Sequence, residues 1–264
     1  MFGDWTTRIN SIAESFSKAK PFSHIVIPNF FDEAVARGIS EEFGTPGGDG
    51  WFEYKNPLER KFAKNENLGK KTAETFDVLQ SPDFVKLMSE ISGISNLCAD
   101  PHLHGAGIHA YPPGGKLDMH LDYSLHPVSG MERRLNLLVF LSEDWKEEYG
   151  GDLILTTDIN APDDNIKKVS PAWNTAVLFC TTDMSIHGLP RPTKSPLFRK
   201  SLAIYYVSPP RPDATHREKA EFFPWRQPVD EKLQKLYDTR PVRRLEKEDL
   251  WEGWEEEGAL SGFW

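Results

Sequence analysis

Apolar residues in the first third of the chain recur every three or four positions, a pattern that predicts amphipathic helices. Three segments show it, at residues 5–19, 30–44 and 81–93, and in the last of them Ser81 is placed to cap the helix N-terminus. Between the first two segments, the apolar run at residues 24–28 predicts a short buried strand. This part of the chain is therefore expected to form a helical support.

From about residue 97 to residue 208 the pattern changes to short apolar runs separated by Gly, Pro, Asn and Asp. Such runs at near-regular spacing, with no helical pattern between them, predict an antiparallel sandwich or barrel. We expect the apolar core to lie in this segment. The predicted strands cover residues 103–111, 133–142, 151–157, 175–180 and 199–208.

After residue 208 the chain continues with an irregular, proline-rich stretch and then two expected helices, at residues 231–238 and 244–257. The predicted fold class is α+β with a mainly β core. We expect a single structural domain with an N-terminal helical support region (1–96), a β core (97–208) and a C-terminal helical extension (209–264).

Charge and cysteine content narrow the functional classes. The formal net charge of −9, from 31 basic and 40 acidic residues, argues against a non-specific nucleic-acid binder. No apolar run has the length of a signal peptide or a membrane span. Cys98 and Cys180 have apolar neighbours and are expected to be reduced thiols of the core, which favours an intracellular, cytoplasmic protein.

Candidate chemistry centres on His120 and Asp122. Side chains two positions apart in an extended segment leave the same face roughly 6.5 Å apart, so both can reach one metal ion. A second histidine would complete a set that leaves three of six coordination positions open for dioxygen chemistry. We favour His187, because the apolar strand at 175–180 can deliver it to the barrel interior. The less favoured candidates are His24, His102, His104, His109, His126 and His216.

Arg199 opens the last predicted strand of the core. A buried arginine is costly unless an anion meets it, and a dicarboxylic co-substrate would be such an anion. A planar guanidinium binds a carboxylate through two parallel hydrogen bonds. Pairing with a protein acid at the strand end is the alternative. Lys200 is a rival cation, but alternation along a strand turns only one of the two residues inward.

Taken in order, these features resemble the Fe(II)- and 2-oxoglutarate-dependent dioxygenases, most closely their prolyl 4-hydroxylase type. The likeness covers about residues 107–207 in four ordered blocks: IHAYPPGGKLDMHLD, RRLNLLVFLSEDWKEEYGGDLIL, VSPAWNTAVLFCTTDMSIHGLP and RKSLAIYY. It implies a double-stranded β-helix, which is a jelly-roll or cupin-like barrel. It also implies Fe(II), 2-oxoglutarate as co-substrate and dioxygen, with ascorbate as the reductant.

The resemblance implies a role for each matching residue. Arg199 would bind the distal carboxylate of 2-oxoglutarate, with Ser201 assisting. Tyr111 matches a tyrosine that commonly hydrogen-bonds the co-substrate, and it can equally be a packing aromatic. The iron ligands would be His120, Asp122 and His187.

Other positions near these blocks also bear on the site. Arg133 and Asn136 either face the pocket or form salt bridges on its rim. Gly150 and Gly151 match paired glycines that turn tightly into the next strand. Phe140 departs from the family pattern, since some hydroxylases of this type have a second polar aromatic there to hold the co-substrate.

We favour a peptidyl-prolyl hydroxylase as the function. The same chemistry on a free amino acid, sugar or other small metabolite is the alternative, because fold does not settle function. A non-catalytic, cupin-like metal-binding protein is the second alternative.

Two segments outside the core bear on the partner. The Gly-rich stretch at 44–62, with Trp51, Phe52 and Tyr54, is either a loop that closes over a peptide or an ordinary connection, and we favour the connection. The acidic, Trp-rich tail either caps the barrel or mediates self-association into a homo-oligomer.

Overall fold

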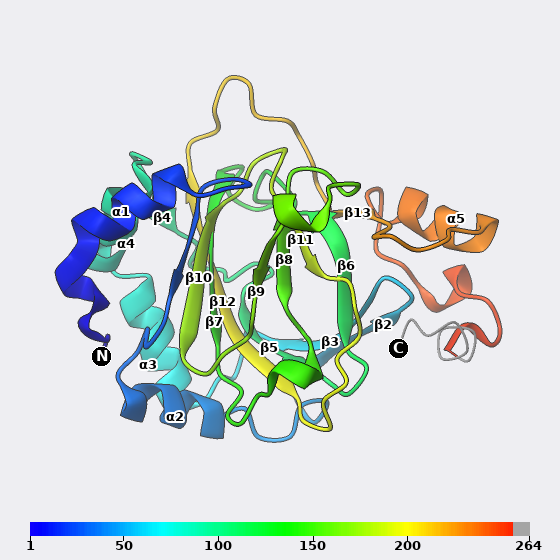
Figure 1. The fold of residues 1–264 in the computed structure, drawn as a ribbon, viewed down its shortest axis with the longest axis horizontal. Helices are drawn as coiled ribbons and strands as arrows, with labels where there is room; N and C mark the ends of the chain where they lie inside the picture. The colour runs from blue at the N-terminus through cyan, green and yellow to red at the C-terminus, as the bar shows by residue number, and fades with distance from the viewer. Residues whose placement is uncertain (256–264) are drawn as a thin grey trace.

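The computed structural model describes residues 1–255 of the chain. Antiparallel strands form a nearly closed barrel, helices α1 to α4 cover one side of it, and α5 lies beyond the opposite side (Figure 1). No helix in this described part is long and apolar enough to cross a membrane. The helices are α1 (Ile9–Lys18), α2 (Glu33–Glu41), α3 (Lys70–Leu79), α4 (Pro82–Ser92) and α5 (Glu231–Thr239).

The strands pair in the order β1-β10-β7-β12-β5-β3-β6-β11-β8-β9, and β13, β2 and β4 add to β6, β3 and β12. This arrangement is the antiparallel, double-stranded β-helix that the sequence predicted. The strands are β1 (His24–Ile27), β2 (Phe52–Asn56), β3 (Glu59–Lys64), β4 (Cys98–Ala99), β5 (Gly107–Tyr111), β6 (Lys116–Leu121), β7 (Glu132–Phe140), β8 (Leu153–Thr156), β9 (Lys167–Val169), β10 (Thr175–Cys180), β11 (Ile186–Leu189), β12 (Arg199–Ser208) and β13 (Glu221–Phe223).

Side-chain alternation along β7 separates the two faces of the sheet. Leu135, Leu137 and Val139 belong to the cluster packed under the helices, whereas Phe140 belongs to a second cluster inside the barrel. That inner cluster joins β7 and β10 to β8 and β9, so the two halves of the barrel pack face to face. Asn136 shares the inward parity of Phe140 and lines the cavity described below.

The apolar core extends beyond residues 97–208, contrary to the sequence prediction. The N-terminal region supplies Trp5, Phe16, Ile39 and Phe76 to the largest cluster, together with outward-facing residues of the sheet. Helices α1 to α4 bury apolar residues in this cluster together with the outer face of the sheet. The N-terminal region is therefore part of the core and not just a support around it.

A β-hairpin, β2–β3, replaces the connection expected at residues 44–62. Asn56 Oδ1 accepts hydrogen bonds from the backbone N–H groups of Leu58 and Glu59, which close the turn. Trp51 packs on the core, while Phe52 and Tyr54 line the cavity next to the barrel mouth.

The helix expected at residues 244–257 does not form within the described residues, and its last two positions lie outside them. Between Arg244 and Glu255 the structure has only a short 3₁₀ turn, Lys247–Asp249, and the first residues of a helical segment. Leu245 and Leu250 pack against the cluster around α5, and a spacing of five does not place two side chains on one helix face. Packing of the segment as irregular chain therefore prevails over its helix-forming composition.

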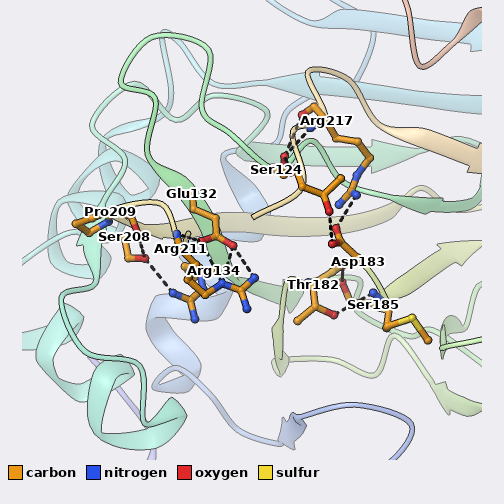
Figure 2. A network of polar contacts seen from close by, with 12 residues as sticks. Ser124, Glu132, Arg134, Thr182, Asp183, Ser185, Ser208, Pro209, Arg211 and Arg217 are labelled. Atoms are coloured by element: carbon orange, nitrogen blue, oxygen red, sulfur yellow. Dashed lines mark hydrogen bonds and ion pairs between the residues drawn. The ribbon is translucent and has the colours of Figure 1, made fainter. Parts of the chain in front are cut away.

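The C-terminal extension is fastened to the barrel end by ion pairs. Figure 2 shows Arg211 turned toward Glu132 and Arg217 turned toward Asp183, with Nη–O distances of 2.7 Å in both pairs. Arg217 also donates from Nε to the backbone oxygen of Asp122 at 3.0 Å. The extension thus contacts the strand that carries the candidate metal ligands.

The two cysteines are free thiols, as predicted, but Cys98 is not in the core. Leu97 is buried beside it, and alternation along the extended chain turns Cys98 to the surface. Cys180, at the end of β10, is partly buried. The apolar neighbours of Cys98 in sequence therefore gave a wrong indication of its burial.

Candidate active site

His120, Asp122 and His187 converge inside the barrel, as the sequence predicted. Their ligand atoms lie within 4.8 Å of one another, and all three residues are buried. Asp122 Oδ1 lies 3.6 Å from His120 Nε2, and Asp122 Oδ2 lies 3.5 Å from His187 Nε2. Within residues 1–255 this is the one group of three or more such residues close enough to hold a metal ion.

Strand pairing brings the two histidines together. His187 on β11 is the direct antiparallel partner of His120 on β6, and their ring centroids lie 4.3 Å apart. Gly188 permits this approach, because a Cβ there would meet backbone oxygens of β6 at 2.8 Å. Asp122 follows β6 directly and points to the same face as His120.

Backbone carbonyls set the orientation of both imidazoles. His120 Nδ1 lies 3.0 Å from the carbonyl oxygen of Asp118, and His187 Nδ1 lies 2.9 Å from that of Ser185. With Nδ1 hydrogen-bonded in this way, Nε2 of each ring is left to face the centre as a ligand atom.

Arg133 and Asn136, both from β7, hold the carboxylate of Asp122. Asn136 Nδ2 donates to Asp122 Oδ2 at 2.8 Å, and an Nη of Arg133 lies 3.3 Å from Asp122 Oδ1. Arg133 Nε also donates to Asn136 Oδ1 at 3.1 Å. Both residues are nearly fully buried, so they belong to the pocket and not to its rim.

The charge states of Asp122 and His187 suit a metal. Burial alone would raise the pKa of Asp122, but the guanidinium of Arg133 and the two histidines outweigh it and hold that pKa well below its usual range. Burial, with His120 adding to it, lowers the pKa of His187 to about 4. Asp122 is therefore ionised and His187 neutral at neutral pH, which are the forms that bind metal ions.

Arg199 lies on the facing wall of the same cavity, at the start of β12. It is 4% exposed and forms no ion pair with any acid among the described residues, although Nε donates to the Gly151 carbonyl at 2.8 Å. Gly151 has φ of 78°, a conformation that favours glycine, and a Cβ there would meet Arg199 Cδ at 3.3 Å. The paired glycines noted in the sequence thus help to place the guanidinium.

Lys200 is not a competitor of Arg199 in this structure. It points out of the barrel, and its Nζ donates to the backbone oxygen of Ser40 at 3.0 Å. Phe140, the residue at which the sequence departs from the family pattern, packs against Arg199. The centre of its ring lies 4.7 Å from the Arg199 guanidinium carbon. An apolar ring therefore packs on the guanidinium where some relatives have a polar one.

Tyr111 and Ser201 line the cavity beside Arg199, and both are buried. The Arg199 guanidinium carbon lies 5.3 Å from the Tyr111 ring. Ser201 pairs in register with His109, whose pKa is lowered to about 3 by burial and by the nearby cations, Lys61 first among them. The contacts of Tyr111 and Ser201 with a co-substrate remain predictions.

The other histidines lie outside the triad. His102 and His104 are in turns that precede β5, so the strand predicted over residues 103–111 begins later and carries His109 without His104. His126 Nε2 lies 3.2 Å from Asp100 Oδ1, which places it in a separate polar cluster. His24 is buried on β1, and His216 is largely exposed.

Residues of the C-terminal extension complete the surroundings of His120, and the sequence pattern gave no sign of them. Phe222 on β13 stacks on the His120 ring. Tyr237 on α5 donates to Asp118 Oδ2 at 2.7 Å, and Lys116 Nζ lies 2.8 Å from Asp118 Oδ1. Asp118 is in turn the residue whose carbonyl orients His120. The pairing of β13 with β6 places Phe222 opposite His120, and α5 brings Tyr237 to Asp118.

The residues present fit the cofactors that the sequence resemblance implies. Two imidazole nitrogens and one carboxylate on one side of a buried site are the donors that suit non-haem iron with open positions. Arg199 supplies a buried cation that forms no ion pair with an acid among residues 1–255, and a dicarboxylate would complement it. The cavity between these two walls has a volume of about 470 Å³, within the range of small-molecule sites.

Comparison with known proteins supports this reading of the site. The family model of the 2OG-Fe(II) oxygenase superfamily matches residues 106–207. Prolyl 3-hydroxylase OGFOD1 of Mus musculus is 24% identical over 192 residues, which cover 72% of this chain and 33% of that protein. The chain thus spans about one third of the length of this curated relative.

Solved structures share the fold. A Pseudomonas putida prolyl-4-hydroxylase gives a TM-score of 0.52 at 14% identity, covering 77% of this chain and 100% of that chain. A Trichoplax adhaerens prolyl hydroxylase, in complex with a hypoxia inducible factor peptide fragment, gives 0.56 at 13% identity, covering 78% and 94%. The triad and Arg199 lie inside the segment 106–207 in which this chain is similar to the 2OG-Fe(II) oxygenase superfamily.

Proposed function

We propose that this chain is an Fe(II)- and 2-oxoglutarate-dependent dioxygenase that hydroxylates a prolyl residue of a peptide. One observation is the main support for the proposal. A buried His-Asp-His triad faces a buried arginine across one cavity, and this arginine forms no ion pair with an acid among residues 1–255. The triad would bind the metal ion, and the arginine would bind a dicarboxylate. A cupin-like barrel that only stored a metal would have no use for Arg199.

In this proposal His120, Asp122 and His187 hold the iron, and Arg199 binds the distal carboxylate of 2-oxoglutarate. When bound, the iron would supply the oxidant chemistry: one oxygen atom of dioxygen converts 2-oxoglutarate to succinate and CO₂, and the other is inserted into a C–H bond of the substrate to give a hydroxyl group. The carbonyls of Asp118 and Ser185 fix the two imidazoles. Arg133 and Asn136 keep the Asp122 carboxylate ionised and oriented. The protein thereby selects the C–H bond that is presented.

The peptidyl-prolyl substrate is supported by two kinds of observation. The relative and the structural neighbours described above are named as prolyl hydroxylases, although they differ between the 3- and the 4-position. The cavity is also open toward the β2–β3 hairpin and the C-terminal extension, where a chain could lie. The proposal includes ascorbate as the reductant and a cytoplasmic location.

The test is incubation of the purified chain with Fe(II), 2-oxoglutarate and ascorbate, together with proline-containing peptides, free amino acids and sugars. The proposal expects a hydroxyl group on a prolyl residue, with amino-acid analysis deciding between the 3- and the 4-position. Hydroxylation of a free amino acid or sugar alone would replace the peptide substrate by the small-molecule alternative. The absence of succinate under every condition would contradict the dioxygenase itself.

A further inference from the structure

The cavity above the triad is rich in positive charge, although the chain as a whole is acidic. Among the described residues, seven Lys and Arg side chains line it against three carboxylates. The formal net charge of the chain is −9. A local field of the opposite sign to the net charge indicates selection for an anionic ligand at this place.

Part of this positive charge is already neutralised within the protein. Arg133 pairs with Asp122. Lys61 Nζ and Arg240 Nε each lie 3.5 Å from a carboxylate oxygen of Glu59, which is almost fully buried. In the proposed function Arg199 is reserved for the co-substrate. These cations are therefore not available to a substrate.

Three cations remain, and each comes from a different segment at the mouth. Lys64 ends β3, Lys219 precedes β13, and Arg244 follows α5. Among residues 1–255 none of the three forms an ion pair with an acid. The remaining carboxylate of the cavity, Glu218, is 72% exposed and lies near His216. The mouth thus presents more cationic than anionic side chains to an incoming molecule.

The mouth continues into a groove along the hairpin. A second cavity of about 330 Å³ lies between β2–β3 and the C-terminal extension. It shares five lining residues with the first: Phe52, Tyr54, Glu59, Arg240 and Arg244. Phe52 is 51% exposed, in edge contact with Tyr54 and 5.4 Å from the Arg244 guanidinium carbon. Positive and negative side chains are equal in number along this second cavity, so the positive excess lies next to the triad.

We propose that the substrate is a peptide with acidic side chains beside the target residue. Its extended chain lies along the groove against Phe52, and its carboxylates are received by Lys64, Lys219 and Arg244. This inference rests on the proposed function and adds the substrate class to it. Complementary charges of this kind speed association and select among partners.

The first test uses fluorescein-labelled peptides with one central proline, flanked on both sides by Glu, Gln or Lys. Fluorescence anisotropy with the full chain should give the tightest binding for the Glu peptide and the weakest for the Lys peptide. The difference should shrink as salt rises, because exposed charges are screened. Equal binding of the Glu and Gln peptides, tighter binding of the Lys peptide, or no binding of any peptide would overturn the proposal.

A charge-reversed variant tests the residues themselves. The double variant Lys219→Glu with Arg244→Glu should bind the Glu peptide about fivefold or more weakly than the wild type, on the scale of exposed charge pairs. It should bind the Lys peptide more tightly than the Glu peptide. A reversed preference cannot come from a misfolded protein. The matched control is Lys70→Glu with Lys86→Glu, because both lysines are exposed on the helical side of the molecule. An unchanged preference in the mouth variant would overturn the proposal.

The two proposals fail separately. Release of succinate from 2-oxoglutarate by the wild-type chain without peptide tests the oxygenase chemistry alone. Succinate release together with equal hydroxylation of the Glu and Lys peptides would refute the acidic substrate and leave the proposed function standing. Tighter anisotropy binding of the Glu peptide without any succinate release would support the acidic ligand and refute the dioxygenase chemistry.

Discussion

The ring of Phe222 lies on the ring of His120, with centroids 5.1 Å apart and planes inclined by 21°. Phe222 is 4% exposed and sits directly opposite His120 in the pairing of β13 with β6. The residue lies outside the segment 106–207 that the family model matches. The C-terminal extension thus helps to orient a proposed iron ligand.

Phe222→Leu should weaken iron binding without unfolding the protein. The substitution keeps an apolar side chain but removes a ring contact, and aromatic pairs contribute about 0.5–1.5 kcal/mol beyond their buried area. We therefore expect the affinity for Fe(II) to fall roughly two- to tenfold in an anaerobic titration. Phe223→Leu is the control, since Phe223 packs on the other face of β13. Equal affinities in the two variants would argue against an orienting role.

Arg199→Gln should raise the 2-oxoglutarate concentration needed for half-maximal turnover by about 30-fold or more, because a buried charge pair loses one partner. Arg199→Lys should recover only part of this loss, since an ammonium group cannot make the two parallel hydrogen bonds. Lys200→Gln removes a neighbouring charge that points out of the barrel, and it should leave the requirement unchanged. A larger effect at Lys200 than at Arg199 would reverse the assignment.

The strands of the core, and the placement of His120 and Asp122 on one face, could be predicted from the sequence because their signals are local. Period-two alternation turns only one of Arg199 and Lys200 inward, and the family's Arg-x-Ser pattern favoured Arg199. The spacing of His120 and Asp122 puts both on one face. His187 was favoured because it follows the apolar strand at 175–180, and the family's order of blocks strengthened that choice. Its pairing with His120 spans 67 positions, and no local pattern encodes that pairing.

The features that could not be predicted depend on contacts between distant segments. Helix α3 was missed because its N-terminus is capped by Glu42, about 30 positions upstream. Phe222 and Tyr237 were missed because only tertiary packing brings them behind His120. The helix expected at residues 244–257 failed for the same reason, since packing against α5 prevailed over local propensity.

The Glu42 cap predicts an acid-dependent loss of stability. Partial burial would raise the pKa of this carboxylate, but hydrogen bonds from the backbone N–H groups of Lys71 and Thr72 and from the Thr72 hydroxyl outweigh it. The folded pKa therefore lies below the ordinary value of 4.5. The stabilising contribution is complete above pH 4.5 and is lost as the pH falls through the folded pKa.

Glu42→Gln should accordingly be less stable than the wild type at neutral pH, and the difference should shrink below pH 4.5. Chemical denaturation at several pH values measures this difference in the free energy of unfolding. The exposed Glu90→Gln on α4 serves as the control for loss of a carboxylate. A difference for Glu42→Gln that stays constant down to strongly acidic pH would rule out the charged cap.

The two cysteines should react at very different rates with an alkylating reagent. Cys98 is exposed, whereas burial raises the pKa of the Cys180 thiol to about 11, with only partial relief from Arg134 and Arg211. At pH 8 roughly one Cys180 in a thousand would be a thiolate, which is the reactive form. Peptide mass mapping after brief treatment with iodoacetamide should find the label on Cys98. Equal labelling of both residues would contradict the burial of Cys180.

Succinate release is the most direct measurement of the central claim, that this triad and Arg199 form a 2-oxoglutarate-dependent iron site. Purified chain with Fe(II), ascorbate and isotopically labelled 2-oxoglutarate should release labelled succinate slowly when no substrate is present. The release should be faster when a proline-containing peptide that the enzyme hydroxylates is added. His187→Ala should abolish the release, and Arg199→Gln should lower it at limiting 2-oxoglutarate. Succinate release by His187→Ala at the wild-type rate, or none from the wild type, would contradict the account.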